Sequence, residues 1–191
     1  MLLIVLGSGV LHATWNAITK ASKDRLVVMA GIGAALTLVG AVVLPFSGMP
    51  AQKAIVFAVV SAAIHVAYDF LLINAYRLGD FNQMYPVARG TSPLVVTLGA
   101  FIFVNEVPSP LELAGVVVLA VGLMSLAFSA GIRRSEIGAL GAAVATGLTI
   151  ACFSLIDGVG VRRSGNPLAY AAFLFVMEGV AIVVATAIAR R

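Results

Sequence analysis

Polar side chains that could do chemistry recur at helical spacing along this sequence, and the first set lies near its start. His12, Trp15, Asn16 and Thr19 are spaced i, i+3, i+4 and i+7, which places them on one face of a helix. An imidazole and a carboxamide inside an apolar helix need partners in protein or water. The stripe therefore either lines a cavity or makes hydrogen bonds to neighbouring helices. Because ionisable groups inside membranes are functional by default, we favour the cavity.

A second set contains His65 and Asp69 at i, i+4, with Tyr68 beside them and Tyr76 further along the same side. A carboxylate within a membrane costs about 2.5–3.5 kcal/mol on insertion scales, so it needs a partner. His65 can supply one, and a histidine–aspartate pair can take up or release a proton near neutral pH. Two interpretations remain open: a proton-coupling pair, and a neutral histidine that holds the aspartate in a static hydrogen-bond network.

A third set contains Tyr85 and Arg89 on one stripe, in a segment interrupted by Pro86 and Pro93. Proline frees a backbone carbonyl and kinks a helix, and broken helices mark binding sites or gates in transporters. Arg89 offers a permanent cation for a carboxylate or phosphate, or for an ion pair with Asp69. It lies roughly 10 Å from the nearer helix end, so snorkelling to the lipid headgroups is the alternative.

The remaining chemistry is sparse. Glu178 lies in the last apolar segment, where nothing apolar can hold it charged. Two alternatives are open for it: it faces the central cavity of a complete transporter, or it is exposed or protonated in a truncated chain. The single cysteine, Cys152, cannot form an internal disulfide, and no Cys/His cluster has metal-ligand spacing. No strand precedes the glycines, which argues against a nucleotide-binding loop. The sequence therefore predicts no catalytic residue, metal or cofactor.

The amino-acid composition indicates that the structure that positions these side chains lies in a membrane. Of the 191 residues, 61% are hydrophobic and 10% are charged, whereas about a quarter of residues are charged in a soluble domain. The mean hydropathy is +1.09. The net charge of +4 reflects Lys and Arg at junctions between apolar segments, with no basic stripe for nucleic acid. The expected partners are the lipid bilayer and a small-molecule substrate, not nucleic acid.

The apolar segments predict an all-α, polytopic transmembrane helix bundle with about seven spans of about 20 residues each. The expected spans are Leu2–Thr19, Leu26–Phe46, Ala54–Tyr76, Asn82–Val104, Leu111–Ser129, Ile137–Ile156 and Leu168–Ala189. Asn166 followed by Pro167 is typical of an N-cap with proline at the first helical position. The last helix should therefore begin there.

An internal repeat relates the first and sixth spans. A shift of 138 residues places Gly9 on Gly147, Ala13 on Ala151, Trp15 on Phe153 and Ile18 on Ile156. The copies are five spans apart, and an odd number inverts the second unit in the membrane, as in secondary transporters. We therefore expect a five-helix unit over residues 1–130 and an incomplete second unit of two helices over residues 136–191.

Two strings of residues resemble the EamA-type transporters of the drug/metabolite transporter superfamily. One is Leu11-His12-Ala13-Thr14-Trp15-Asn16, followed by Lys20. The other is Tyr85-Pro86-Val87-Ala88-Arg89-Gly90-Thr91-Ser92-Pro93, which follows Ala75-Tyr76-Arg77-Leu78-Gly79-Asp80 and precedes Asn105-Glu106. The resemblance spans roughly residues 1–190. It implies an inverted arrangement of five plus five helices in the inner (plasma) membrane, cytoplasmic termini, and export of small metabolites or amphipathic compounds.

Two departures limit what the resemblance implies. The related four-helix small multidrug resistance proteins keep an essential glutamate in helix 1, where this sequence has His12. Glutamate-based exchange of a proton for a drug therefore does not carry over. The last three helices of the family pattern are also absent, which predicts a chain truncated in its second repeat. Self-association or the missing C-terminal helices would then complete the bundle.

The orientation in the membrane has two conflicting indications. The junctions after the odd-numbered helices carry Lys20, Lys23, Arg25, Arg77, Arg133, Arg134, Arg190 and Arg191, and the opposite junctions carry Lys53, Arg162 and Arg163. By the positive-inside rule, this distribution puts the N-terminus outside. The resemblance puts the N-terminus in the cytoplasm, and this is the orientation we expect.

The leading hypothesis is a secondary transporter with a cavity among its first, third and fourth helices. The predicted substrate-binding residues are His12, Trp15, Asn16, Tyr85 and Arg89, and the predicted proton-coupling residues are His65 and Asp69. One alternative is an inactive or partner-dependent transporter fragment. The other is an intramembrane enzyme, which the sequence disfavours because Tyr68-Asp69 lacks the second, Gly-x-Gly-Asp motif of membrane aspartyl proteases.

Overall fold

The computed structural model describes residues 21–129, 131 and 136–191, together with Gly7, Gly9, Val10, Thr14, Ala17 and Ile18. In this part of the chain the regular structure is entirely helical, and six helices are long and apolar enough to cross a membrane. The all-α, multi-pass class predicted from composition is confirmed. Most of the first predicted span, including His12, Trp15 and Asn16, lies outside the described residues.

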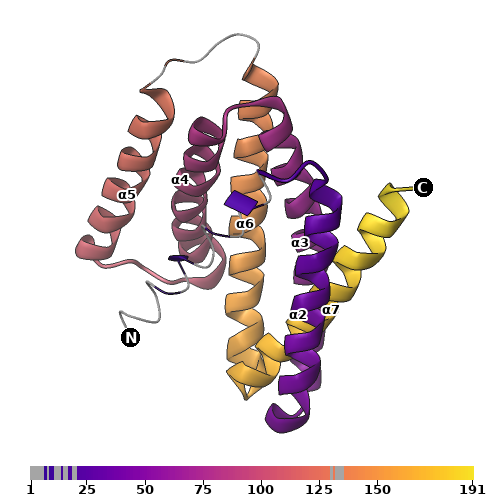
Figure 1. Cartoon of the computed structure of the whole chain (residues 1–191). Helices are drawn as coiled ribbons and strands as arrows, with labels where there is room; N and C mark the ends of the chain where they lie inside the picture. The colour runs from indigo at the N-terminus through magenta and orange to yellow at the C-terminus, as the bar shows by residue number, and fades with distance from the viewer. Residues whose placement is uncertain are drawn as a thin grey trace.

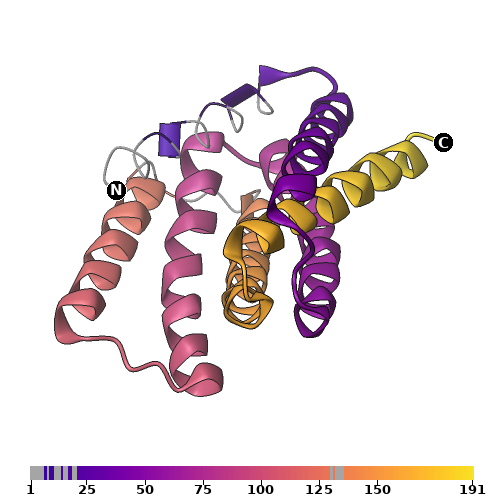
Figure 2. The ribbon, with the colours of Figure 1, turned by 90° about the horizontal axis from the view of Figure 1, so that it is seen from below.

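The helices follow one another along the chain (Figure 1). They are α2 (Arg25–Ser47), α3 (Gln52–Leu78), α4 (Phe81–Gly99), α5 (Pro110–Phe128), α6 (Ile137–Ser164) and α7 (Pro167–Ala189), and α4 continues into the π-helical turn η1 (Ala100–Val104). In the view from below, α5 and α4 lie on one side of α6, and α2 and α7 cross on the other (Figure 2).

Side-chain caps determine where several helices begin. The Asp24 carboxylate accepts a hydrogen bond from the N–H of Val27 at the start of α2. Asn166 caps α7 by accepting from the N–H groups of Leu168 and Ala169, with Pro167 at the first helical position. These caps satisfy donors that have no partner within the helix. The start of α7 predicted from Asn166 and Pro167 is confirmed.

The C-terminal end of α6 differs from the prediction. The sequence predicted a span ending at Ile156, but α6 continues to Ser164. It stops where Gly165 adopts a φ of 74°, the left-handed conformation that glycine adopts without steric cost. Arg162 and Arg163 occupy the last turn, where cations interact favourably with the helix dipole. The polar residues that suggested a junction are therefore the end of a longer helix.

The most extensive contact between two described helices joins α2 and α7. The backbones approach closely at Gly33 against Gly179 and again at Gly40 against Ala172. The residue numbers rise along α2 as they fall along α7, so the two helices are antiparallel. Small residues at a crossing allow this approach, which in a membrane supplies much of the packing energy.

Polar contacts close both ends of the α2–α7 pair. At one end, the Asn166 side-chain amide donates a hydrogen bond of 2.9 Å to the carbonyl oxygen of Ser47. At the other end, Arg190 forms an ion pair with Asp24. Both contacts lie at helix ends, where these groups need not enter the hydrocarbon region of a bilayer.

The rest of the bundle packs around α6, which contacts α3 extensively and α4 on another side, while α4 also contacts α5. Gly147 lets α6 approach α4, since a Cβ there would lie 2.7 Å from the carbonyl oxygen of Ala88. The main core contains Tyr68, Leu72 and Tyr76 of α3. Large apolar side chains elsewhere point outward, as expected for helices surrounded by lipid.

The α2–α7 crossing should not tolerate a methyl group at Gly40. A Cβ there would lie 2.5 Å from the Ala172 carbonyl oxygen and 2.9 Å from the Val176 nitrogen, both of which are backbone atoms. We expect Gly40→Ala to lower the free energy of unfolding by about 1–3 kcal/mol. The measurement is an SDS titration in mixed micelles, followed by circular dichroism.

Gly31→Ala is the matched control for this prediction, since nothing lies within 4 Å of a Cβ at Gly31 on the same helix. Its effect should stay within about 1 kcal/mol. Equal unfolding energies for the two variants would contradict the assignment of Gly40 to a tight crossing.

Candidate functional site

A cavity of about 440 Å³ lies inside the bundle, and α2, α3, α4, α6 and α7 all contribute to it. Its polar lining consists of His65, Tyr68, Asp69, Arg89, Ser154 and Glu178. Its apolar lining consists of Ile32, Leu36, Ile150, Phe153, Phe175 and Ile182. Mostly apolar walls with a few convergent polar groups are typical of a small-molecule site.

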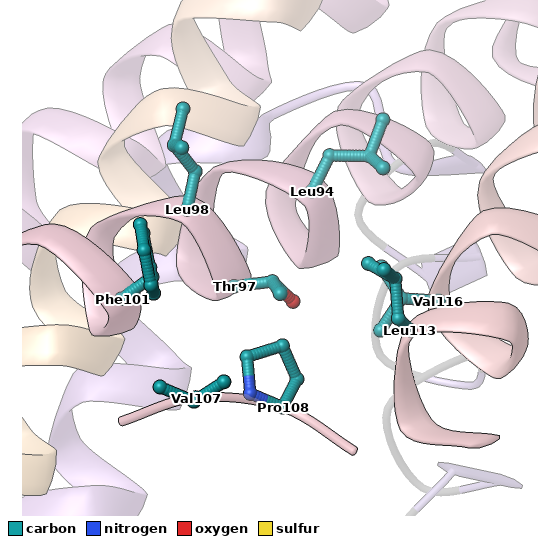
Figure 3. Close-up of a pocket in the computed structure, with 8 residues that line it drawn as sticks. All are labelled: Leu94, Thr97, Leu98, Phe101, Val107, Pro108, Leu113 and Val116. Carbon is teal, nitrogen blue, oxygen red and sulfur yellow. The ribbon is translucent and has the colours of Figure 1, made fainter. Parts of the chain in front are cut away.

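A second pocket, of about 360 Å³, has a different character (Figure 3). It lies between the end of α4 and α5, and its lining includes Leu98, Phe101 and Val107. Thr97 is its one polar side chain, and the Thr97 hydroxyl already donates a hydrogen bond to the carbonyl oxygen of Pro93. Leu98 and Val107 are exposed on the outside of the bundle. This pocket suits apolar chains and offers no polar recognition.

Asp69 is the most deeply buried charged side chain of the inner cavity. Only 7% of it is exposed, and its Oδ2 atom has no hydrogen-bond partner among the described residues. The carboxyl group of Glu178, on α7, lies close enough to repel it electrostatically. An unpaired carboxyl group inside a membrane protein is costly, and its retention needs an explanation beyond packing.

His65 shares this cavity with Asp69 but makes its hydrogen bonds elsewhere. The His65 Nδ1 atom lies 2.9 Å from the Ser61 carbonyl oxygen and 3.3 Å from the Ser61 hydroxyl, one turn earlier on α3. No hydrogen bond joins the imidazole to Asp69 in the described part of the chain. The predicted pair thus shares a face, but the static network between the two side chains is not observed.

Aromatic rings form one wall of the cavity. The His65 ring stacks on Phe153 of α6, with centroids 3.8 Å apart and an angle of 24° between planes. Tyr68 meets Phe153 edge to face at 5.7 Å. Such contacts restrict the side chains on α3 and α6 and leave ring faces and edges along the cavity.

Arg89 lines the cavity from α4. Its guanidinium group interacts with the Tyr68 hydroxyl and lies 5.7 Å from the centroid of the Tyr85 ring, within the range of a cation–π contact. Tyr85 itself packs against the main core instead of lining the cavity. The ion pair suggested between Arg89 and Asp69 is not present, since the ion pairs of the described residues lie at the helix ends.

The structure therefore brings His65, Asp69 and Arg89 together and places Tyr85 behind Arg89. Glu178 joins them from α7, which agrees with the first of the two alternatives for this residue. His12, Trp15 and Asn16 lie outside the described residues.

Three α6 residues of the cavity were not predicted as site residues, although the repeat contains a signal for them. The 138-residue shift places His12 on Ile150, Trp15 on Phe153 and Asn16 on Ser154. All three α6 positions line the cavity. Applying the same shift to the predicted site residues of the first span would have identified these three positions on α6.

Among the described residues, no group of three or more His, Cys, Asp or Glu side chains is arranged to hold a metal ion. No family model, curated protein or solved structure matches the chain. The functional assignment therefore rests on the cavity and on the helices that surround it.

Because ionised groups need water or partners, we expect water to enter the cavity. Ser154→Cys, in a Cys152→Ser background, should react with a small hydrophilic thiosulfonate roughly tenfold or more faster than native Cys152. The reactive thiolate needs a polar surrounding, and Cys152 is exposed on the outside of α6, where lipid would surround it. The measurement is adduct formation by mass spectrometry in proteoliposomes, and equal rates would contradict a hydrated cavity.

Proposed function

We propose that this multi-pass membrane protein is a secondary transporter and that the inner cavity holds its substrate. The observation that carries the proposal is Asp69, which is buried with an unpartnered carboxyl oxygen in a cavity that also contains Arg89 and Glu178. Ionisable side chains within membrane helices are rare and mark substrate and ion pathways.

A polar pair elsewhere in the bundle shows what a structural role looks like. The Tyr170 hydroxyl donates a hydrogen bond of 2.8 Å to Oδ1 of Asp157, which joins α7 to α6. Tyr170 is 1% exposed and packs against Gly160. Asp69 has no comparable partner for its Oδ2 atom. The contrast favours a carboxyl group kept for binding over one kept for packing.

The packing of α2 and α7 supports an EamA-type architecture with an inverted repeat. These helices are five spans apart, run antiparallel and cross through glycines. A pair at equivalent places in two inverted units would meet in this way at the pseudo-two-fold axis. The α6 residues that correspond to His12, Trp15 and Asn16 line the cavity, which supports the same role for the first helix.

In this proposal, Arg89 contributes a hydrogen-bond donor to the site of a small metabolite or amphipathic substrate, and Tyr85 holds the guanidinium in place. His12, Trp15 and Asn16 complete the site, while His65 and Asp69 couple transport to protons. The two repeats rock against each other in the inner membrane and expose the cavity to each side in turn. An exported compound leaves the cell by this route.

The test uses purified protein in proteoliposomes that contain a pH-sensitive dye. A panel of amino acids, sugars, nucleotides and amines is added, and a substrate is recognised by the proton flux that it causes. We expect Asp69→Asn to reduce this flux by about tenfold or more, since it removes a charge-assisted contact.

Asp80→Asn is the matched control, because Asp80 caps α4 at the membrane surface and asparagine is an equally good cap. Its flux should equal that of the unmodified protein. The coupling role would be refuted by substrate-dependent proton flux that survives Asp69→Asn. The transporter assignment would be refuted if no compound of the panel caused proton flux and none, added in radiolabelled form, entered the vesicles, while the helices remained folded.

A further inference from the structure

The two carboxyl groups that line the cavity, Asp69 and Glu178, come from different helices, α3 and α7. We infer that Asp69 and Glu178 form one binding site for an organic ammonium group, and that a proton competes with this group for the site. The inference names a substrate class for the cavity and so rests on the proposed function. It also makes Glu178, in place of His65, the partner of Asp69.

The balance of charge around the cavity supports a cationic ligand. Asp69 and Glu178 contribute two carboxyl groups, and Arg89 of α4 contributes one guanidinium group. That guanidinium interacts with Tyr68 and Tyr85, and it forms no ion pair with Asp69. With both carboxyl groups ionised and the His65 imidazole neutral, the cavity lacks one positive charge. A single monovalent cation between α3 and α7 would restore neutrality and relieve their repulsion.

Two further titratable groups lie near the pair. His65 lies near Glu178, and its Nδ1 atom is hydrogen-bonded to the Ser61 carbonyl oxygen. Asp157 of α6 also lies near Glu178, and its Oδ1 atom accepts the Tyr170 hydroxyl. The α2 residues of the lining are apolar.

The shape and the walls of the cavity favour an organic cation over a bare metal ion. A volume of about 440 Å³ is within the range of small-molecule sites. The described residues provide no metal-binding group of three or more side chains. The rings of Tyr68, Phe153 and Phe175 line the same space, and aromatic faces attract ammonium groups.

The test measures binding of radiolabelled phenethylamine to the purified chain in lipid nanodiscs, with empty nanodiscs subtracted. The uncharged analogue N-acetylphenethylamine should compete at least about tenfold less well, since it lacks the charge-assisted contacts. Affinity should fall as the pH is lowered from about 8 to about 5, because a proton on either carboxyl group removes negative charge from the site. Sodium chloride at fixed pH should not displace the amine.

Asp69→Asn and Glu178→Gln should each weaken binding by about tenfold or more. Their matched controls, Asp80→Asn and Glu106→Gln, change carboxyl groups at helix ends and should bind like the unmodified chain. If either site variant fails to fold, the other variant and the comparison of the two amines decide the question.

Equal competition by the uncharged analogue, pH-independent affinity, displacement by sodium, or full binding by both site variants would each overturn the ammonium site. None of these results bears on transport, because binding in nanodiscs needs no movement across a membrane. Conversely, specific binding without any flux in proteoliposomes would refute the proposed function and leave the ammonium site standing.

Discussion

The cost of exposing a polar side chain to lipid organises this bundle. Asp69, Arg89 and Glu178 come from three helices, and none of them can face hydrocarbon without a large penalty. Turning these residues inward fixes the rotation of α3, α4 and α7 about their own axes. The outward faces of these helices then carry exposed apolar side chains such as Val59, Leu98 and Val184. The cavity and the lipid-facing surface are two results of one constraint.

Backbone approach is the second requirement, because hydrophobic burial alone does not bring helices together in lipid. Glycine supplies it at the crossing of α2 and α7, and again where Gly147 of α6 meets α4. In the same bundle α6 and α7 both contact α3, so that Phe153 stacks on His65 and Glu178 lines the same cavity as Asp69. The small residues therefore determine the geometry of the polar cavity without lining it.

The sequence was sufficient for what is decided locally. Apolar length predicted the described spans, and Asn166 with Pro167 predicted the start of α7. The end of α6 was missed because Arg162 and Arg163 were interpreted as a junction, although they lie in the last turn of the helix. Asp157, just beyond the predicted end at Ile156, accepts the Tyr170 hydroxyl of α7, so a tertiary contact satisfies a polar residue inside the longer helix.

The same division between local and tertiary information applies to the cavity. Helical periodicity correctly placed His65 and Asp69 on one face of α3. Their partners could not be predicted in this way, because they depend on the distances between α3 and the other helices. His65 is hydrogen-bonded to the backbone carbonyl of Ser61, one turn away on the same helix. This contact is local and does not depend on how the helices pack. Asp69 shares its cavity with a carboxyl group from α7, a juxtaposition that only helix packing creates. Two carboxyl groups that the fold brings into one cavity without an ion pair suggest that a ligand, and not the protein, supplies the missing charge.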